Sequence, residues 1–142
     1  MSPSAPVQSQ YPLISDTINR LRSLSQQDVQ GFWHRCPKDI ATLSLPFQEM
    51  DWQSWSQSSL NDRHHIAWRR GKVPLWLHQR FTWPNALNGY SLEGYSAKLA
   101  LRWWADQAEL YINGKLAHTG DIFDCWTRLD LTDHVIPDQA VD

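Results

Sequence analysis

The chain has 142 residues, a formal net charge of −2 and a pI near 6.3. This length predicts one domain, and the near-neutral charge gives no electrostatic reason to expect nucleic acid or an anionic membrane as a partner. No apolar run approaches the ~20 residues that span a bilayer, and the N-terminus has neither the basic start nor the apolar core of a secretory signal. We therefore expect a cytoplasmic protein with no nucleic-acid and no membrane partner.

The N-terminal part is predicted in two stretches. Residues 1–12 contain three prolines with Ser and Gln, a composition typical of a disordered tail. Residues 13–62 form an N-terminal helical segment followed by an irregular linker. Apolar residues recur there at near-helical spacing, which predicts one amphipathic helix or two short ones, with Ser15 or Asp16 as the cap and Gly31 as a stop. The linker from residue 36 has at most one short strand, near residues 40–45.

Residues 63–142 show the pattern of short strands and turns. In AKLALRWWA, Leu99, Leu101 and Trp103 alternate with polar or small residues, so adjacent Trp103 and Trp104 should lie on opposite faces of a strand. Asn113-Gly114 suits the type I′ turn of a hairpin. WTRLDLTDHVI predicts one more strand and nothing after it, so the sandwich is expected to be incomplete at its C-terminal end. The fold class predicted is mainly β, a jelly-roll sandwich preceded by one or two helices.

Two cysteines, Cys36 and Cys125, lie far apart in the chain. In the cytoplasm such a pair is expected to be reduced, without a disulfide or a metal site. The unusual residue is tryptophan, with nine in the chain. Its large apolar ring with one N–H donor suits both protein cores and surfaces that face carbohydrate.

Three stretches, LWLHQRFTWP, AELYINGKLAHTGD and TRLDLTDHVIPDQ, resemble the galactose-binding-like N-terminal β-sandwich of glycoside hydrolases of family 2 and their relatives. Together with TINRLRSLSQQDVQGFW, HHIAWRRGK and GYSLEGYSAKLALRWWAD, they are similar to the leading segment of bacterial, cyanobacterial-type α-mannosidases of glycoside hydrolase family 38. The resemblance covers most of residues 15–138 and is most specific from Gly89 to Leu131.

The resemblance implies a non-catalytic module that packs on the catalytic domain of the hydrolase and shapes the rim of its active site. In that family the zinc ligands and the nucleophilic aspartate belong to the catalytic domain, so no cofactor is expected in this chain. The implied partners are that catalytic domain or a second subunit, with mannose-containing glycans as a further partner. The parent family is enzymatic, whereas these 142 residues contain no catalytic machinery of that kind.

The residues themselves offer weak catalytic candidates. Asp121 and Asp124 flank Ile122-Phe123 in a loop, and glycoside hydrolysis uses two carboxylates ~5–9.5 Å apart. Aspartates three residues apart in a polar loop more often cap turns through their side chains. The resemblance instead suggests that this loop lines the rim of the partner's active site. Adjacent His64 and His65 would point to opposite faces of a strand, and no metal-ligand spacing is present. The sequence thus predicts neither a catalytic nor a metal residue.

A set of polar and aromatic residues could contact either a sugar or another domain. These residues are Arg102, Trp104, Tyr111, Asp121, Asp124 and Trp126. An exposed indole or phenol can stack on a pyranose, with charged groups reaching its hydroxyls, which would make the chain an independent carbohydrate-binding module. Exposed apolar patches more often mark contacts with another protein surface. The interface is the favoured interpretation, and carbohydrate binding is the alternative.

Overall fold

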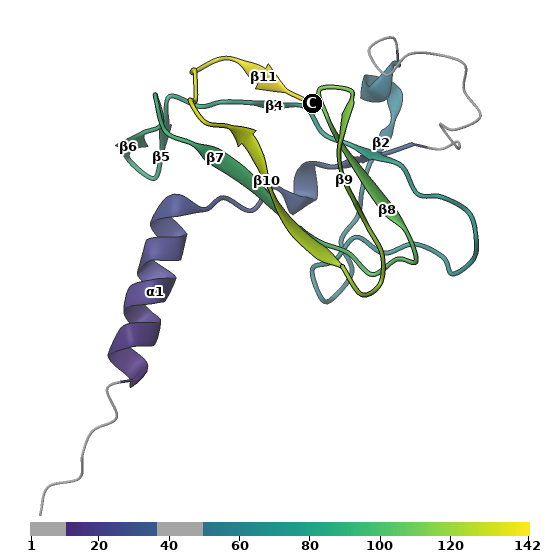
Figure 1. The fold of residues 1–142 in the computed structure, drawn as a ribbon, viewed down its shortest axis with the longest axis horizontal. Helices are drawn as coiled ribbons and strands as arrows, with labels where there is room; N and C mark the ends of the chain where they lie inside the picture. Colours follow the sequence, from purple (N-terminus) through teal and green to yellow (C-terminus); the bar gives the residue numbers. More distant parts are fainter. Residues whose placement is uncertain (1–10, 37–49) are drawn as a thin grey trace, which may run out of the picture.

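The computed structural model describes residues 11–36 and 50–142. It is mainly β, with one α-helix at its N-terminal end and several small antiparallel sheets (Figure 1). The helical elements are α1 (Tyr11–Ser25) and the 3₁₀ turns η1 (Gln30–Phe32) and η4 (Trp52–Ser54). None of the helices in these two ranges is both long and apolar enough to cross a membrane.

The helix begins earlier than predicted. It starts at Tyr11, so Pro12 lies in its first turn. Proline is well tolerated there, because backbone N–H groups in the first turn have no acceptor within the helix and the N–H that proline lacks is not missed. It ends at Ser25, and the last apolar residues of the predicted pattern fall in η1 instead. Asp28 accepts a hydrogen bond from the N–H of Gln30 at 2.9 Å, which favours a new turn there. The strand predicted near residues 40–45 lies outside the described residues.

The first sheet has three strands in the order β2-β1-β3, and every pairing in it is antiparallel. Its strands are two residues long: β1 (His34–Arg35), β2 (Ser56–Gln57) and β3 (Leu77–His78). Beyond β1, the N–H of Cys36 donates to the carbonyl of Trp76 at 3.0 Å. This sheet joins the segment that follows α1 to the strands of the C-terminal part.

The remaining strands form four antiparallel pairs. The pairs are β4 (Phe81–Thr82) with β11 (Ala140–Val141), β5 (Ala86–Leu87) with β6 (Tyr90–Ser91), β7 (Ala97–Arg102) with β10 (Trp126–Thr132), and β8 (Ala108–Ile112) with β9 (Lys115–Gly120). The predicted hairpin is confirmed: Asn113 and Gly114 both have positive φ, 50° and 76°, as a type I′ turn requires.

The sequence pattern missed β11. This strand pairs with β4, and the ladder is extended where the N–H of Trp83 donates to the carbonyl of Gln139 at 3.0 Å. A two-residue strand is too short to show alternation, so the C-terminal end of the chain looked unstructured from its sequence. In the structure that end contributes to the core.

The core lies where β4, β11 and the segment before β11 meet. Trp83, Val135 and Val141 are its buried members. Partly buried side chains from neighbouring elements pack against them, namely Phe81, Leu92, Ala97, Ile112 and Leu131. Among the described residues this is a small core, and many large apolar side chains stay exposed.

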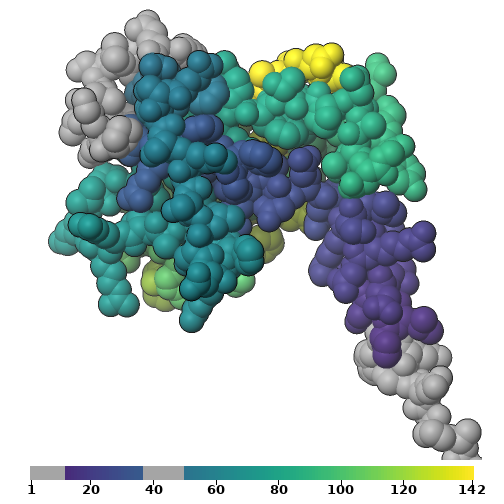
Figure 2. Space-filling model, turned by 180° about the vertical axis from the view of Figure 1, so that it is seen from behind, coloured from purple at the N-terminus to yellow at the C-terminus, as the bar shows by residue number. Residues whose placement is uncertain are grey.

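Helix α1 extends away from this body, as both the ribbon and the space-filling view from behind show (Figures 1 and 2). Its C-terminal end is held by the side-chain amide of Asn88, which donates to the carbonyls of Ser23 at 2.7 Å and Leu24 at 3.2 Å. These carbonyls belong to the last turn of the helix, where acceptors have no partner within the helix itself. The attachment is therefore polar and confined to one end.

Candidate functional site: an arginine–tryptophan face on β7 and β10

The predicted alternation in β7 is confirmed by the burial of its residues. Leu99 and Leu101 are partly buried, whereas Lys98, Ala100 and Arg102 are exposed. Trp103 and Trp104, directly after the strand, continue the alternation, with Trp103 partly buried and Trp104 exposed. The two adjacent tryptophans therefore lie on opposite sides of the sheet, as the sequence predicts.

Strand β10 places a second row of side chains beside this one. Trp126 is opposite Arg102, Arg128 is opposite Ala100, and Asp130 is opposite Lys98. The N–H of Trp103 donates to the carbonyl of Cys125, so that pair is hydrogen-bonded and the neighbouring Arg102–Trp126 pair is not. Side chains approach each other most closely at non-hydrogen-bonded pairs, with Cα atoms ~4.5 Å apart. We call the exposed residues Arg102, Trp104, Trp126 and Arg128 the arginine–tryptophan face.

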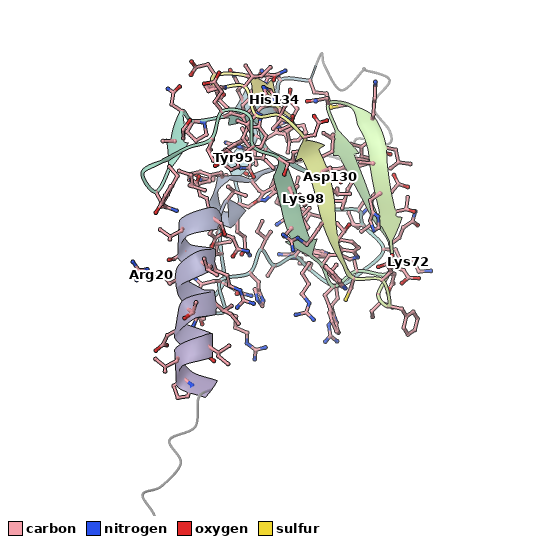
Figure 3. All side chains as sticks on the ribbon, turned by 60° about the vertical axis from the view of Figure 1, so that its left-hand side comes forward. Arg20, Lys72, Tyr95, Lys98, Asp130 and His134 are labelled. Atoms are coloured by element: carbon pink, nitrogen blue, oxygen red, sulfur yellow. The ribbon has the colours of Figure 1, made fainter. Side chains whose placement is uncertain are left out.

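The charges on this sheet are unevenly paired. Lys98 Nζ donates to Asp130 Oδ1 at 2.5 Å, and Figure 3 shows the two residues on neighbouring strands. Within the part of the chain that the structure describes, neither Arg102 nor Arg128 makes an ion pair. One end of the sheet surface is thus neutral, and the end with the tryptophans carries two uncompensated positive charges.

The loop between β9 and β10 is fastened beneath the face by Trp103. The indole N–H of Trp103 donates to the carbonyl of Asp121 at 3.1 Å. Gly120 leaves room for this indole, because a Cβ at that position would collide with it and with the carbonyl oxygen of Asp124. In this loop Phe123 is 93% exposed, and on the face Trp104 is 71% and Trp126 is 61% exposed.

Asp121 shapes this loop and is unsuited to act as a general acid. Its Oδ1 accepts hydrogen bonds from the backbone N–H of Phe123 at 2.7 Å and of Asp124 at 2.9 Å. These hydrogen bonds lower the pKa of the Asp121 carboxyl, and the bond from the N–H of Asp124 has the larger effect. Glycoside hydrolysis needs one carboxyl group with a raised pKa. The turn-capping interpretation of Asp121 therefore holds. The second aspartate of the loop, Asp124, has its Oδ2 atom 3.8 Å from Nε2 of His118.

Tyr111 is on a different sheet from the arginine–tryptophan face. It lies on β8, its hydroxyl donates to Glu109 Oε2 at 2.7 Å, and this bond raises the pKa of the phenol. Its ring centroid is 6.2 Å from that of Trp76. Of the six predicted contact residues, the structure thus gathers Arg102, Trp104 and Trp126, with Asp121 and Asp124 in the adjoining loop.

Sequence reasoning missed a second cluster, around Trp52 in η4. Its ring is 4.7 Å from that of His78, and Arg80 lies over it at 5.6 Å from the ring centroid. The cluster also includes His34, Trp55 and Asp142. These six residues come from four separate parts of the chain, so no spacing within the sequence could have indicated their meeting.

Asp142 organises the charges of the Trp52 cluster. Arg80 donates to both of its carboxylate oxygens, at 2.8 and 2.7 Å, and this hydrogen bonding lowers the pKa of Asp142. His78 Nε2 lies 3.3 Å from Asp142 Oδ1. Burial nevertheless lowers the pKa of His78, since desolvation outweighs the attraction of Asp142. The ring and ion contacts connect η4 and the residue after β11 to β3, and we interpret the cluster as a structural fastening of these elements. Within the described residues, Nδ1 of His34 and Nδ1 of His78 are buried without a hydrogen-bond partner.

In residues 11–36 and 50–142, no three His, Cys, Asp or Glu side chains are grouped so that they could hold a metal ion. Two hollows among the described residues lie away from the arginine–tryptophan face. The larger, of about 510 Å³, lies between the end of α1 and β4–β5, where Gln26, Phe81 and Asn88 are among its lining residues. The candidate site is a surface of exposed side chains.

Comparison with known proteins adds no further assignment: no protein-family profile, no curated protein and no solved structure matches the chain.

Proposed function

We propose that the chain is a non-catalytic N-terminal module of an α-mannosidase-like glycoside hydrolase. Its β-strands would form a galactose-binding-like jelly-roll sandwich, and its task would be to pack on the catalytic domain and shape the rim of the active site. The resemblance of the segment from Gly89 to Leu131 motivates the enzyme class. The observation that carries the proposal is the exposed apolar surface of α1.

The apolar residues of α1 form a stripe without a covering surface in the described part of the chain. Ile14, Ile18 and Leu21 are spaced by four and three residues, so they share one face of the helix, and Leu13 borders them. All four are exposed, and α1 extends from the body (Figure 2). Burying one such side chain stabilises a structure by ~1.5–3 kcal/mol. A helix of this kind is typically covered by another protein surface.

The docking proposal is tested with the isolated catalytic domain of a bacterial family-38 α-mannosidase. Titration calorimetry of the purified chain against this domain should show saturable binding. Ile18→Glu should weaken binding about tenfold or more, equivalent to ~1.4 kcal/mol, because it places a charge in the stripe. Asn19→Glu is the matched control on the opposite side of the helix and should bind within about twofold of the original chain.

Circular dichroism of both variants checks that α1 remains helical, and sedimentation of the chain alone separates self-association from docking. Equal affinities for the two variants, or no binding by the original chain, would contradict the proposal. Assay of the isolated chain on an aryl α-mannoside tests the non-catalytic part. Turnover by the pure chain, above that of buffer, would overturn it.

The second candidate function is an independent carbohydrate-binding module. The specific observation in its favour is the exposure of Trp104, Trp126 and Phe123 on and beside one sheet surface. Titration with mannosides and mannan, followed by tryptophan fluorescence, would show saturable quenching that is lost in Trp104→Ala or Trp126→Ala. A module that only docks through α1 would show no quenching in this titration.

A further inference from the structure

The two exposed surfaces of this chain differ in chemistry. The stripe on α1 is aliphatic, as expected for contact with another protein. The arginine–tryptophan face carries two guanidinium groups and two indoles, and the only small apolar residue between them is Ala100. Protein interfaces have apolar centres from which charge is depleted. A surface of alternating rings and cations is better matched to a hydrated, polar ligand with flat apolar faces, such as a sugar.

The spacing on the face suits one sugar residue for each ring and cation. Trp126 and Arg128 are two residues apart on β10, which places their Cα atoms ~7 Å apart on the same side of the sheet. Arg102 lies directly across from Trp126. A pyranose that stacks on the indole of Trp126 would therefore have a guanidinium group within reach on either side.

The charge of the face selects the kind of sugar. Guanidinium groups bind carboxylates through two parallel N–H···O bonds, and the structure gives Arg102 and Arg128 no carboxylate partner among the described residues. The third cation of the sheet, Lys98, is already neutralised by Asp130. A neutral glycan would leave both guanidinium charges uncompensated.

The loop that leads into Trp126 is also held in place before any ligand arrives. The β9–β10 loop is fixed by the Trp103–Asp121 hydrogen bond and by the two backbone bonds to the Asp121 carboxylate. A surface that is already ordered loses less conformational entropy on binding. We propose that the arginine–tryptophan face binds oligosaccharides that carry carboxylate groups, with Trp126 and Trp104 stacking on the sugar rings and Arg102 and Arg128 binding the carboxylates.

This inference rests on the second candidate function, carbohydrate binding, and is independent of docking through α1. The test is a fluorescence and calorimetric titration of the full chain with two uronic-acid probes, tetragalacturonate and tetramannuronate. The fully methyl-esterified tetragalacturonate and mannotetraose are the neutral controls. We expect saturable binding of an acidic probe in the millimolar range or tighter, at least tenfold weaker binding of its ester, and loss of affinity when ionic strength rises from ~0.05 to ~0.5 M.

Variants assign the binding to the face. Arg102→Gln and Arg128→Gln should each weaken binding of the acidic probe about tenfold or more, and Trp126→Ala should abolish the quenching. Lys98→Gln, which removes the neutralised cation, and Trp68→Ala, which removes a partly exposed indole elsewhere, are the matched controls and should change affinity less than twofold. Thermal unfolding of each variant checks that it is folded.

Three results would overturn the inference. Equal affinity for tetragalacturonate and its ester would show a sugar site without selection for charge, leaving only the general carbohydrate-binding candidate. No binding of any of the four probes would remove both the inference and that candidate. Weakened docking of Arg102→Gln to the catalytic domain, without binding of acidic probes, would identify the face as a protein contact.

Discussion

Trp103 and Trp104 are adjacent in the chain but have opposite environments. Trp103 lies over Gly120 and donates its indole N–H to the backbone of the β9–β10 loop, whereas Trp104 is exposed on the arginine–tryptophan face. Alternation along a strand predicted this separation. The particular partner of Trp103 could not be predicted, because Gly120 belongs to a different sheet and meets the indole only through the tertiary arrangement of β7 and β9.

Gly120→Ala tests this close contact. The added Cβ would overlap the ring of Trp103 and the carbonyl oxygen of Asp124, so we expect the free energy of unfolding to fall by about 1–3 kcal/mol, as for other overpacking substitutions. Gly31→Ala is the matched control, because nothing lies within 4 Å of its added Cβ. Urea denaturation measures both. Equal stabilities of the two variants would contradict the contact.

Long alternating strands were predictable from the sequence, whereas isolated two-residue strands such as β1 and β11 were not. β7, β10 and the β8–β9 hairpin lie where the pattern of six or seven residues and the Asn113-Gly114 turn placed them. The two-residue strands β1 and β11 depend on partners distant in sequence, so no local pattern reveals them. In contrast, β3 and β4 lie within LWLHQRFTWP, one of the stretches that resemble a β-sandwich. The sequence indicated three of the four residues of the arginine–tryptophan face, all but Arg128. It indicated none of the Trp52 cluster, whose members meet through short strands.

The link between β3 and β11 should depend on pH. His78 and Asp142 connect these strands, and burial keeps the pKa of His78 below its ordinary value of 6.5. The unfolded chain therefore binds a proton at higher pH than the folded chain, and stability must fall as pH drops below about 6.5 towards the lowered pKa. The lowered pKa of Asp142 acts at more acidic pH, where protonation removes the stability gained from Arg80.

Urea denaturation at pH 7.5 and pH 5.5 measures this dependence. We expect the loss of stability between these values to be smaller in His78→Gln than in the original chain. His65→Gln, at an exposed histidine, is the control and should leave the dependence unchanged. If His78→Gln showed the same pH dependence as the original chain, burial of His78 would not be its cause.

The whole molecule has a small core and extensive exposed apolar surface. Among the described residues, the buried hydrophobic side chains are Cys36, Trp83, Val135 and Val141, and of these Val135 is fully buried. The exposed apolar side chains include the stripe on α1 and the indoles of the arginine–tryptophan face. A marginal core combined with such surfaces fits a module that gains stability from its partner, because a partner that binds only the folded chain raises its apparent stability.

The importance of this core can be measured at Val135, whose exposed fraction is 1%. Val135→Ala removes two buried methyl groups and should lower the free energy of unfolding by about 2 kcal/mol. Val73→Ala removes the same groups from a side chain that is 78% exposed, and it should change stability by less than about 0.5 kcal/mol. A similar loss in both variants would show that Val135 does not belong to the stabilising core.

The pairing of β4 with β11 has a consequence for the order of folding during synthesis. Trp83 obtains its packing partners Val135 and Val141 from residues more than fifty positions later in the chain. The β8–β9 hairpin closes over a few residues and can form on the ribosome early, whereas the core must wait until Val141 has emerged from the exit tunnel. At ~5–20 residues per second, the nascent chain spends several seconds with Trp83, a core side chain of the folded protein, exposed.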